Sequence, residues 1–303
     1  CALPIYASAA DPDRLAAALS AAETAGRDAS VAAFFSTGTS DLDAGRYLEM
    51  LAAWTGAALA ALPAPARALA ELLAHLDEND RRSFVVDRVW PVLWTQRHGG
   101  DAPPLDTALE PLLAAAVAEA TALDPDDVDS PRGYRMHPGV AEAVRADTDP
   151  DAAAAMDDVV SSWLGFLSET GRERESGGTR GLGTAIVWAG LAAVPYLLRR
   201  RRWTEAADLI EAAVDRDGSP ETCQRALGYL RQILDGETDP GMRMVYEGLY
   251  AQVLAAVDPA AAEVLLRTAV DAARERGQLD HAAVSANELV TLLRDRGDLA
   301  AAL

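Results

Sequence analysis

A change in the spacing of apolar residues marks one short segment near the middle of the chain. From Tyr134 to His137, apolar and polar residues alternate with the period of two that is typical of a half-buried β-strand. From Val140 onward the apolar residues have helical spacing instead. Pro138 stands where a first helical turn tolerates proline, because the N–H that proline lacks would have no partner there. The pattern therefore predicts a strand that ends at His137 and a helix that begins directly after it.

Helical spacing of apolar residues covers most of the first half of the chain. Residues 1–62 contain two such patterns and are expected to form a helical lead-in. Residues 63–147 contain three more, followed by two short strand patterns. The predicted elements are a helix over residues 63–76, a helix capped by Asn79-Asp80 that Pro91 would kink or split, a helix that begins near Leu105, and strands over residues 116–123 and 134–137. Three helices and a β-hairpin are the elements of a winged-helix domain.

The second half of the chain is predicted to be a helix, a linker and a set of helical repeats. Residues 148–183 are expected to form one helix, followed by a charged, glycine-rich joint that starts at Gly171. Residues 184–303 repeat a small-large-small spacing, which places alanines at 206, 262 and 302. Such spacing is typical of tetratricopeptide-like helical pairs that stack into an α-solenoid. The uneven distances of 56 and 40 residues between these alanines predict an irregular or extra helix in the middle.

Composition and charge narrow the classes of function. The 303 residues carry a formal net charge of -20, and reading the sequence shows no lysine. A surface this acidic repels phosphate backbones, so we expect no nucleic-acid partner. Cys1 and Cys223 have no partner at metal-ligand spacing, which suits a reducing cytoplasm. No membrane-spanning or signal segment is expected. Because the chain starts at Cys1 and stops inside a helical motif, we expect an excised fragment.

A search for catalytic and metal-binding motifs predicts neither kind of site. A phosphate-binding loop of the GxxxxGK[ST] type needs a lysine, and no His-Glu-x-x-His or Cys-x-x-Cys is present. His75 and His281 are expected to be ordinary helix-surface residues, and His98 suits a helix C-terminus. The acidic turn at residues 124–129 lacks the glycine and the glutamate of a calcium loop. The four arginines at 199–202 are expected to complement a helix dipole.

The segment Tyr134-Arg135-Met136-His137-Pro138 resembles the Met-His-Asp motif of the signal-transduction (STAND) ATPases of the NB-ARC type. In that family a winged-helix domain follows the nucleotide-binding core, and the histidine of the motif contacts the β-phosphate of bound ADP and locks the inactive state. Met136 and His137 match the motif, whereas Pro138 replaces its aspartate. The order of winged helix, helical linker and tetratricopeptide-like repeats is also similar to that of bacterial members, so the resemblance covers roughly residues 40–303.

The resemblance implies that Met136 and His137 sense a nucleotide if an ATPase core precedes Cys1 in the same polypeptide. ADP or ATP is then the expected cofactor, held by that core. The chain itself is expected to hold no cofactor, no metal ion and no catalytic residue. The residues alone leave a second interpretation of His137 open, in which its side chain only satisfies the end of the strand.

The expected function is therefore that of a non-catalytic regulatory and sensor fragment of a multidomain signalling ATPase in the cytoplasm. Its repeats are expected to bind a protein or peptide in the groove that stacked helical pairs form. A role in bacterial defence is expected only by analogy with the family. Two alternative functions are a transcriptional regulator whose winged helix binds DNA and a plain repeat scaffold. The third helix carries Asp106 and Glu110 and no arginine, which disfavours DNA binding.

Overall fold

The chain is mainly helical, with one two-stranded sheet among the residues described. A computed structural model describes residues 54–124, 131–178 and 181–298. The chain divides into two compact units, residues 1–159 (unit 1) and residues 160–303 (unit 2), and each unit is described by itself. Residues 54–61 are helical, as predicted for the end of the lead-in, and the rest of that segment lies outside the described residues. Within the described ranges, no helix combines the length and the apolar character needed to cross a bilayer.

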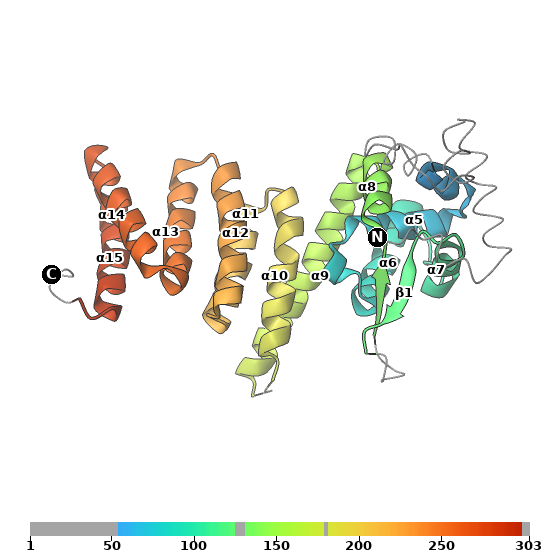
Figure 1. Ribbon diagram of the computed structural model, residues 1–303, viewed down its shortest axis with the longest axis horizontal. Helices are drawn as coiled ribbons and strands as arrows, with labels where there is room; N and C mark the ends of the chain where they lie inside the picture. Colours follow the sequence, from blue (N-terminus) through green and yellow to red (C-terminus); the bar gives the residue numbers. More distant parts are fainter. Residues whose placement is uncertain (1–53, 125–130, 179–180, 299–303) are drawn as a thin grey trace, which may run out of the picture. The chain divides into compact units, whose positions relative to one another are not determined.

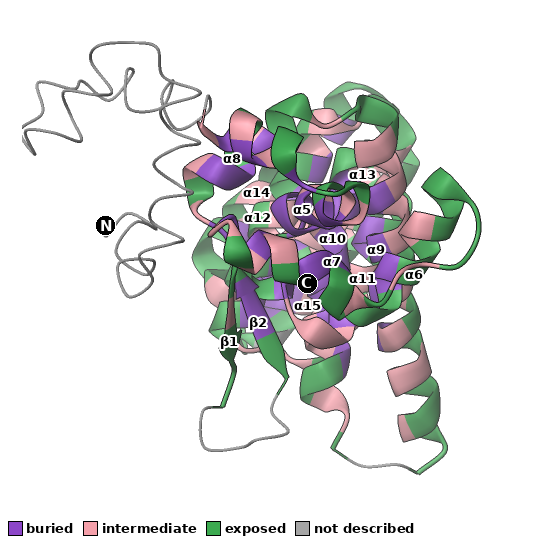
Figure 2. Cartoon of the chain, turned by 90° about the vertical axis from the view of Figure 1, so that its right-hand side faces the viewer, coloured by how far each residue is buried: buried purple, intermediate pink, exposed green. Residues whose placement is uncertain are grey.

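The described part of unit 1 contains the three helices and the β-hairpin predicted for residues 63–147, with some bounds shifted. Its elements are α5 (Ala64–His75), the short 3-10 helix η1 (Glu78–Asp80), α6 (Ser83–His98), α7 (Leu105–Ala114), β1 (Glu119–Ala122), β2 (Arg132–Arg135), α8 (Pro138–Asp147) and the start of α9 (Pro150–Ser176). The centre of the unit is α5, which Figure 2 shows as largely buried. Leu69, Leu72 and Leu73 of α5 are buried as their spacing predicted.

The second helix begins later than the sequence predicted. Asn79 and Asp80 lie in η1 and do not cap the second helix, α6, which starts at Ser83. The cause is a contact with β2. The carbonyl of Arg81 accepts the N–H of Tyr134 at 2.7 Å, and Arg82 forms a β-bridge with Gly133. These two contacts tie residues 81–82 to β2, and Arg82 is extended. Pro91 lies inside α6 and does not split it.

The hairpin is also shorter than predicted and shifted along the chain. β1 and β2 are antiparallel, with Glu119 opposite Arg135 and Ala122 opposite Arg132. The start of the predicted first strand instead closes α7, since the N–H groups of residues 117 and 118 both donate to the carbonyl of Leu112. The end of the predicted second strand is taken up by the start of α8. Both strands therefore lose residues to the ends of neighbouring helices.

Unit 2 consists of the rest of α9 and three antiparallel helix pairs, which Figure 1 shows following one another from α10 to α15. The helices are α10 (Gly183–Arg199), α11 (Trp203–Arg216), α12 (Pro220–Gly236), α13 (Pro240–Val257), α14 (Pro259–Glu275) and α15 (Leu279–Asp295). The first helices of the pairs begin at residues 183, 220 and 259, which are 37 and 39 residues apart. The irregular or extra helix predicted for the middle is wrong, because α12 and α13 form a regular pair.

Two details of the predicted second half need correction. Ala206 lies in the second helix of its pair and Ala262 in the first helix of its pair, so they are not equivalent positions. The spacing matched these two alanines because both are completely buried, although they lie in different helices of their pairs. Position 302 lies outside the described residues. The linker also starts later than Gly171, since α9 continues to Ser176. A Cβ on Gly171 would lie 2.6 Å from a side-chain carbon of Ile186, so this glycine permits close packing rather than flexibility.

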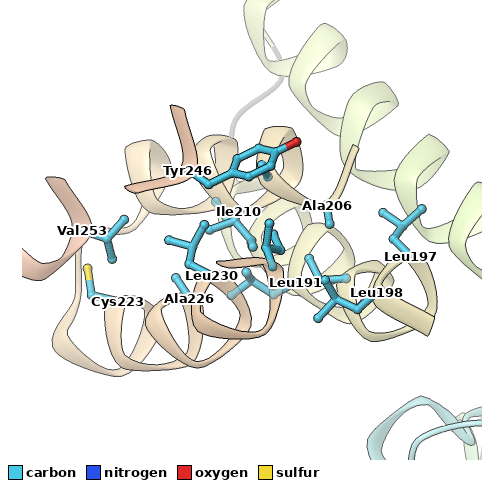
Figure 3. Packing of buried hydrophobic residues seen from close by; sticks show 14 residues of the cluster. Leu191, Leu197, Leu198, Ala206, Ile210, Cys223, Ala226, Leu230, Tyr246 and Val253 are labelled. Atoms are coloured by element: carbon cyan, nitrogen blue, oxygen red, sulfur yellow. The ribbon is translucent and has the colours of Figure 1, made fainter. Parts of the chain in front are cut away.

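The core of unit 2 is formed by apolar side chains from α10 to α13 (Figure 3). Ile210, Leu230 and Tyr246 from three successive helices are almost completely buried there. A second, smaller cluster joins α13 to α14 and α15 through Ala251, Ala262, Leu266 and Leu292. Each pair therefore buries its apolar faces against its neighbours, as an amphipathic helix requires.

A backbone turn that recurs three times in unit 2 contains one residue of an unusual type. After α10, α14 and α15, the third residue beyond the helix donates its N–H to a carbonyl five residues back, as in a Schellman cap. The residue directly before this donor has a positive φ in all three turns. It is Gly277 (φ 69°) and Gly297 (φ 80°) in two of them, but Arg201 (φ 54°) in the third. Arginine is therefore in a conformation that favours glycine.

We expect Arg201→Gly to raise the free energy of unfolding of unit 2 by about 1 kcal/mol, because glycine adopts this conformation without a Cβ clash. Chemical denaturation measures the change. Arg200→Gly is the matched control: it removes the same charge at the neighbouring position, whose φ is −88°. There glycine adds freedom to the unfolded chain and removes the contacts of the Arg200 side chain, so stability should fall. Equal effects of the two substitutions would contradict the role of strain at Arg201.

Candidate functional site

The joint between β2 and α8 holds the two residues that the family resemblance points to. Met136 follows the strand and is 7% exposed, so its side chain belongs to the core of unit 1. His137 is the N-cap residue of α8, as the pattern of apolar positions predicted for a strand-to-helix joint. Pro138 occupies the first position of α8. Met136 thus fixes the chain in the core, and His137 stands half-buried at the start of the helix.

Local chemistry explains why the helix begins here. Pro138 has a fixed φ and no N–H to leave unsatisfied, so it suits the first helical position. His137 Nδ1 accepts a hydrogen bond from the backbone N–H of Gly139 at 3.2 Å, which satisfies one of the free donors of the helix end. Val140 and Val144 of α8 are buried and hold the helix on unit 1.

The cap decides which nitrogen of His137 carries the proton. Because Nδ1 accepts a hydrogen bond, the neutral imidazole must carry its hydrogen on Nε2. Within the described part of the chain, Nε2 has no hydrogen-bond partner. The ring therefore presents a donor, and a donor is what an acceptor such as a phosphate oxygen needs. The structure thus gives His137 a capping role and leaves its second nitrogen available for another contact.

Tyr134 beside this joint has no acid–base role at neutral pH. Its side chain is buried, and this burial, followed by the charge of Asp87, raises the pKa of its phenol above the ordinary value of 10.0. A raised phenol pKa keeps the hydroxyl protonated. Tyr134 therefore acts as a core residue of the hairpin.

Acidic side chains gather where α6, α7 and the hairpin approach one another. Burial, followed by the negative charge of Asp106, raises the pKa of the Asp87 carboxyl. Arg132 of β2 lies 3.9 Å from the Asp106 carboxylate, which makes a weak ion pair between exposed groups. Asp124 is the last described residue of the predicted acidic turn, most of which lies outside the described residues. The described residues contain no group of three or more side chains placed to hold a metal ion.

His75 is not the surface residue that its sequence position predicted. Its Nε2 lies 2.7 Å from Oδ1 of Asp157, and the two side chains are only 9% and 6% exposed. The pair connects the end of α5 with the first half of α9 inside unit 1. Helical spacing could not show this burial, because it depends on where α9 packs. His98, in contrast, ends α6 as predicted.

The arginines at 199–202 behave as their position predicted. α10 ends at Arg199, so the cations follow the negative end of the helix dipole. The Arg199 guanidinium lies 4.5 Å from the centre of the Tyr196 ring, and Arg202 pairs with Glu205 of α11. Arg199 and Arg202 are therefore engaged in contacts within the helix pair itself.

The exposed apolar side chains of unit 2 are concentrated in its last three helices. Those in the last three helices are Val245 of α13, Val264 of α14, and Leu279, Val284 and Val290 of α15, and Phe166 of α9 is a further one. Single exposed apolar residues are ordinary, but several on neighbouring helices offer a surface for a partner. The sequence predicted binding by the repeats without locating these residues.

A cleft in unit 1 was not predicted from the sequence. It has a volume of about 360 Å³ and lies between α5, α6 and the first turns of α9. Trp90, Trp94 and His98 of α6 border it, and they are spaced four residues apart. Aromatic residues at this helical spacing share one face of a helix. That spacing was the available signal, but the opposite wall comes from distant residues.

Comparisons of the chain with protein-family models, with curated proteins and with solved structures gave no match.

Proposed function

We propose that this chain is the regulatory and sensor region of a multidomain signalling ATPase of the STAND, NB-ARC-like class. In this proposal residues 63–147 act as a winged-helix domain that reports the nucleotide state, and residues 184–303 act as tetratricopeptide-like repeats that bind a protein or peptide. The observation that carries the proposal is the free Nε2 donor of His137 at the joint between β2 and α8. A neutral imidazole donor at this position can hydrogen-bond an oxygen of the ADP β-phosphate.

The order of elements supports the proposal. Helices α5, α6 and α7 are followed by the β1–β2 hairpin and then by α8, which is the order of a winged-helix domain. The helix pairs of unit 2 begin 37 and 39 residues apart. Tetratricopeptide repeats have a period of about 34 residues, so these pairs are slightly longer than that unit.

The switch needs only a modest difference in binding energy. A ligand that binds the active arrangement better than the ADP-locked one shifts the population by that difference alone. Moving the equilibrium from 1:99 to 99:1 needs about 5.5 kcal/mol. A peptide that covers exposed apolar side chains such as Val264 and Leu279 can supply energy of this size. Nucleotide itself would be bound by a preceding ATPase core, in the cytoplasm.

DNA binding by the winged helix is the weaker alternative. In α7, Asp106 and Glu110 are exposed, and Asp87 of α6 is close enough to Asp106 for the two charges to interact. The two carboxylates on α7, which has no basic residue, repel phosphates. A plain scaffold is the remaining alternative, and it differs from the proposal in giving His137 no role in nucleotide binding.

The coding sequence upstream of Cys1 tests the proposal directly. We expect an ATPase core joined in frame, with a phosphate-binding loop that contains the lysine this chain lacks. The mass of the native protein, measured by immunoblotting and mass spectrometry, should agree with that longer polypeptide. A start codon at or just before Cys1, together with a native mass near 32.0 kDa, would rule the proposal out.

A further inference from the structure

The cleft of unit 1 has mostly apolar walls and a charged rim. Its volume of about 360 Å³ lies in the range of small-molecule sites. Leu72 of α5, Leu93 and Trp94 of α6, and Met156 of α9 supply apolar walls. Only a small part of the lining is polar. Such a lining favours a ligand whose body is apolar and whose polar groups are few.

The aromatic wall is held in place before any ligand binds. Trp90 Nε1 donates a hydrogen bond to the carbonyl of Pro103 at 3.0 Å, which fixes its ring. The centre of the Trp94 ring lies 5.4 Å from that of Trp90 and 4.1 Å from that of His98, so Trp94 contacts both rings. A ring packed against two others loses little conformational freedom when a ligand contacts it. Trp94 is therefore a preformed contact surface.

The charges around the cleft leave a net negative rim. Arg97 is the cation of the rim, and its guanidinium is paired with Glu71. Asp149 caps α9 by accepting the N–H groups of Asp151 and Ala152. The Asp151 carboxylate is exposed and, among the described residues, has no hydrogen-bond or ion-pair partner. One unpaired carboxylate next to an indole wall is complementary to a cation.

We propose that this cleft binds a small organic cation with an apolar, aromatic body, of the arylalkylamine class. The aromatic body lies against Leu93, Trp94 and Met156, and the ammonium group pairs with the Asp151 carboxylate at the rim. Attraction between the cation and the Trp94 indole adds to this ion pair. The inference rests on the cleft alone and holds whether or not the chain belongs to a signalling ATPase.

Phenethylamine and phenylacetate are the probes that test the cleft, because they share a ring and differ in the sign of their charge. The full chain is labelled with 5-fluorotryptophan, which gives one ¹⁹F signal for each of its six tryptophans. The Trp94→Phe variant identifies the signal of Trp94. We expect phenethylamine to shift that signal in a saturable manner at millimolar concentration, and phenylacetate at the same concentration to leave it in place.

Substitutions of single carboxylates complete the test. Asp151→Asn should weaken phenethylamine binding about fivefold, the size expected for an exposed ion pair. Asp215→Asn removes an equal charge from an exposed position of α11 that does not line the cleft, and should leave binding unchanged. The proposal is overturned if phenethylamine gives no saturable shift, if phenylacetate binds as well, or if the two variants behave alike.

Discussion

Replacing His137 with alanine is expected, under the proposed function, to weaken ADP binding by the longer polypeptide about 10- to 100-fold and to cause signalling without ligand. The estimate follows from a hydrogen bond to a charged group, which contributes about 1.5–3 kcal/mol. In the proposed switch, loss of this bond would free residues 63–147 from the ADP-bound arrangement. The rate of release of a fluorescent ADP analogue measures the first effect, and the output of the effector domain in cells measures the second.

The capping role of His137 makes a second variant necessary. Alanine removes the hydrogen bond from the Gly139 N–H as well, so His137→Ala should also cost about 1 kcal/mol of stability. His137→Ser restores a good N-cap but cannot reach a nucleotide. If His137 senses ADP, both variants release ADP quickly. If His137 only caps α8, serine behaves as the native protein and ADP release is unchanged in both, which is the result that a plain scaffold requires.

Breaking the His75–Asp157 pair should destabilise unit 1 strongly. Asp157→Ala leaves the buried imidazole without its hydrogen-bond partner at 2.7 Å, and an unsatisfied buried polar group costs about 1–3 kcal/mol. Denaturation followed by tryptophan fluorescence measures the loss, because Trp90 and Trp94 lie in the same unit. Glu173→Ala, at an exposed position of the same helix, should change stability by less than about 0.5 kcal/mol.

A double-mutant cycle separates the pair from other effects of the substitutions. His75→Ala and Asp157→Ala should together cost less than the sum of the two single changes, because the second substitution removes a group that has already lost its partner. We expect a coupling energy of about 1–3 kcal/mol. Strict additivity would mean that the two side chains do not stabilise one another, whatever their distance.

The parts of the fold that the sequence predicted correctly depend on neighbours along the chain. Helical spacing located α5, α7 and α8 because each buries a face set by residues three and four apart. Pro138 at the start of α8 and the change from strand spacing to helical spacing likewise placed His137 at a strand-to-helix joint. These signals are local, so one sequence is enough to read them.

The parts that were predicted wrongly depend on contacts between distant residues. α6 starts late because residues 81–82 pair with β2, about 50 residues further on. Gly171 was taken as a flexible joint because glycine permits many conformations, whereas it serves here to let Ile186 approach. His75 was assigned to the surface because no residue near it in the sequence indicates its contact with the distant Asp157.

The sequence predicted where the candidate site lies along the chain but not how its side chains are arranged. The sequence located His137, but it could not show that Nδ1 caps α8 and that Nε2 is therefore the donor. The cleft of unit 1 escaped prediction altogether. Its walls come from α5, α6 and α9, and only the four-residue spacing of Trp90, Trp94 and His98 is visible in one segment.

The two separate apolar clusters of unit 2 have a consequence for how the repeats open. α13 contributes to both clusters, with Tyr246 and Val253 in the larger one and Ala251 in the smaller. We therefore expect the last pair, α14 and α15, to form a separate cooperative segment that can unfold while α10 to α12 stay intact. This pair also carries the exposed Val264 and Leu279. A ligand bound there would slow amide hydrogen exchange in the last pair first, and the repeats would respond to it as a graded array rather than as one rigid block.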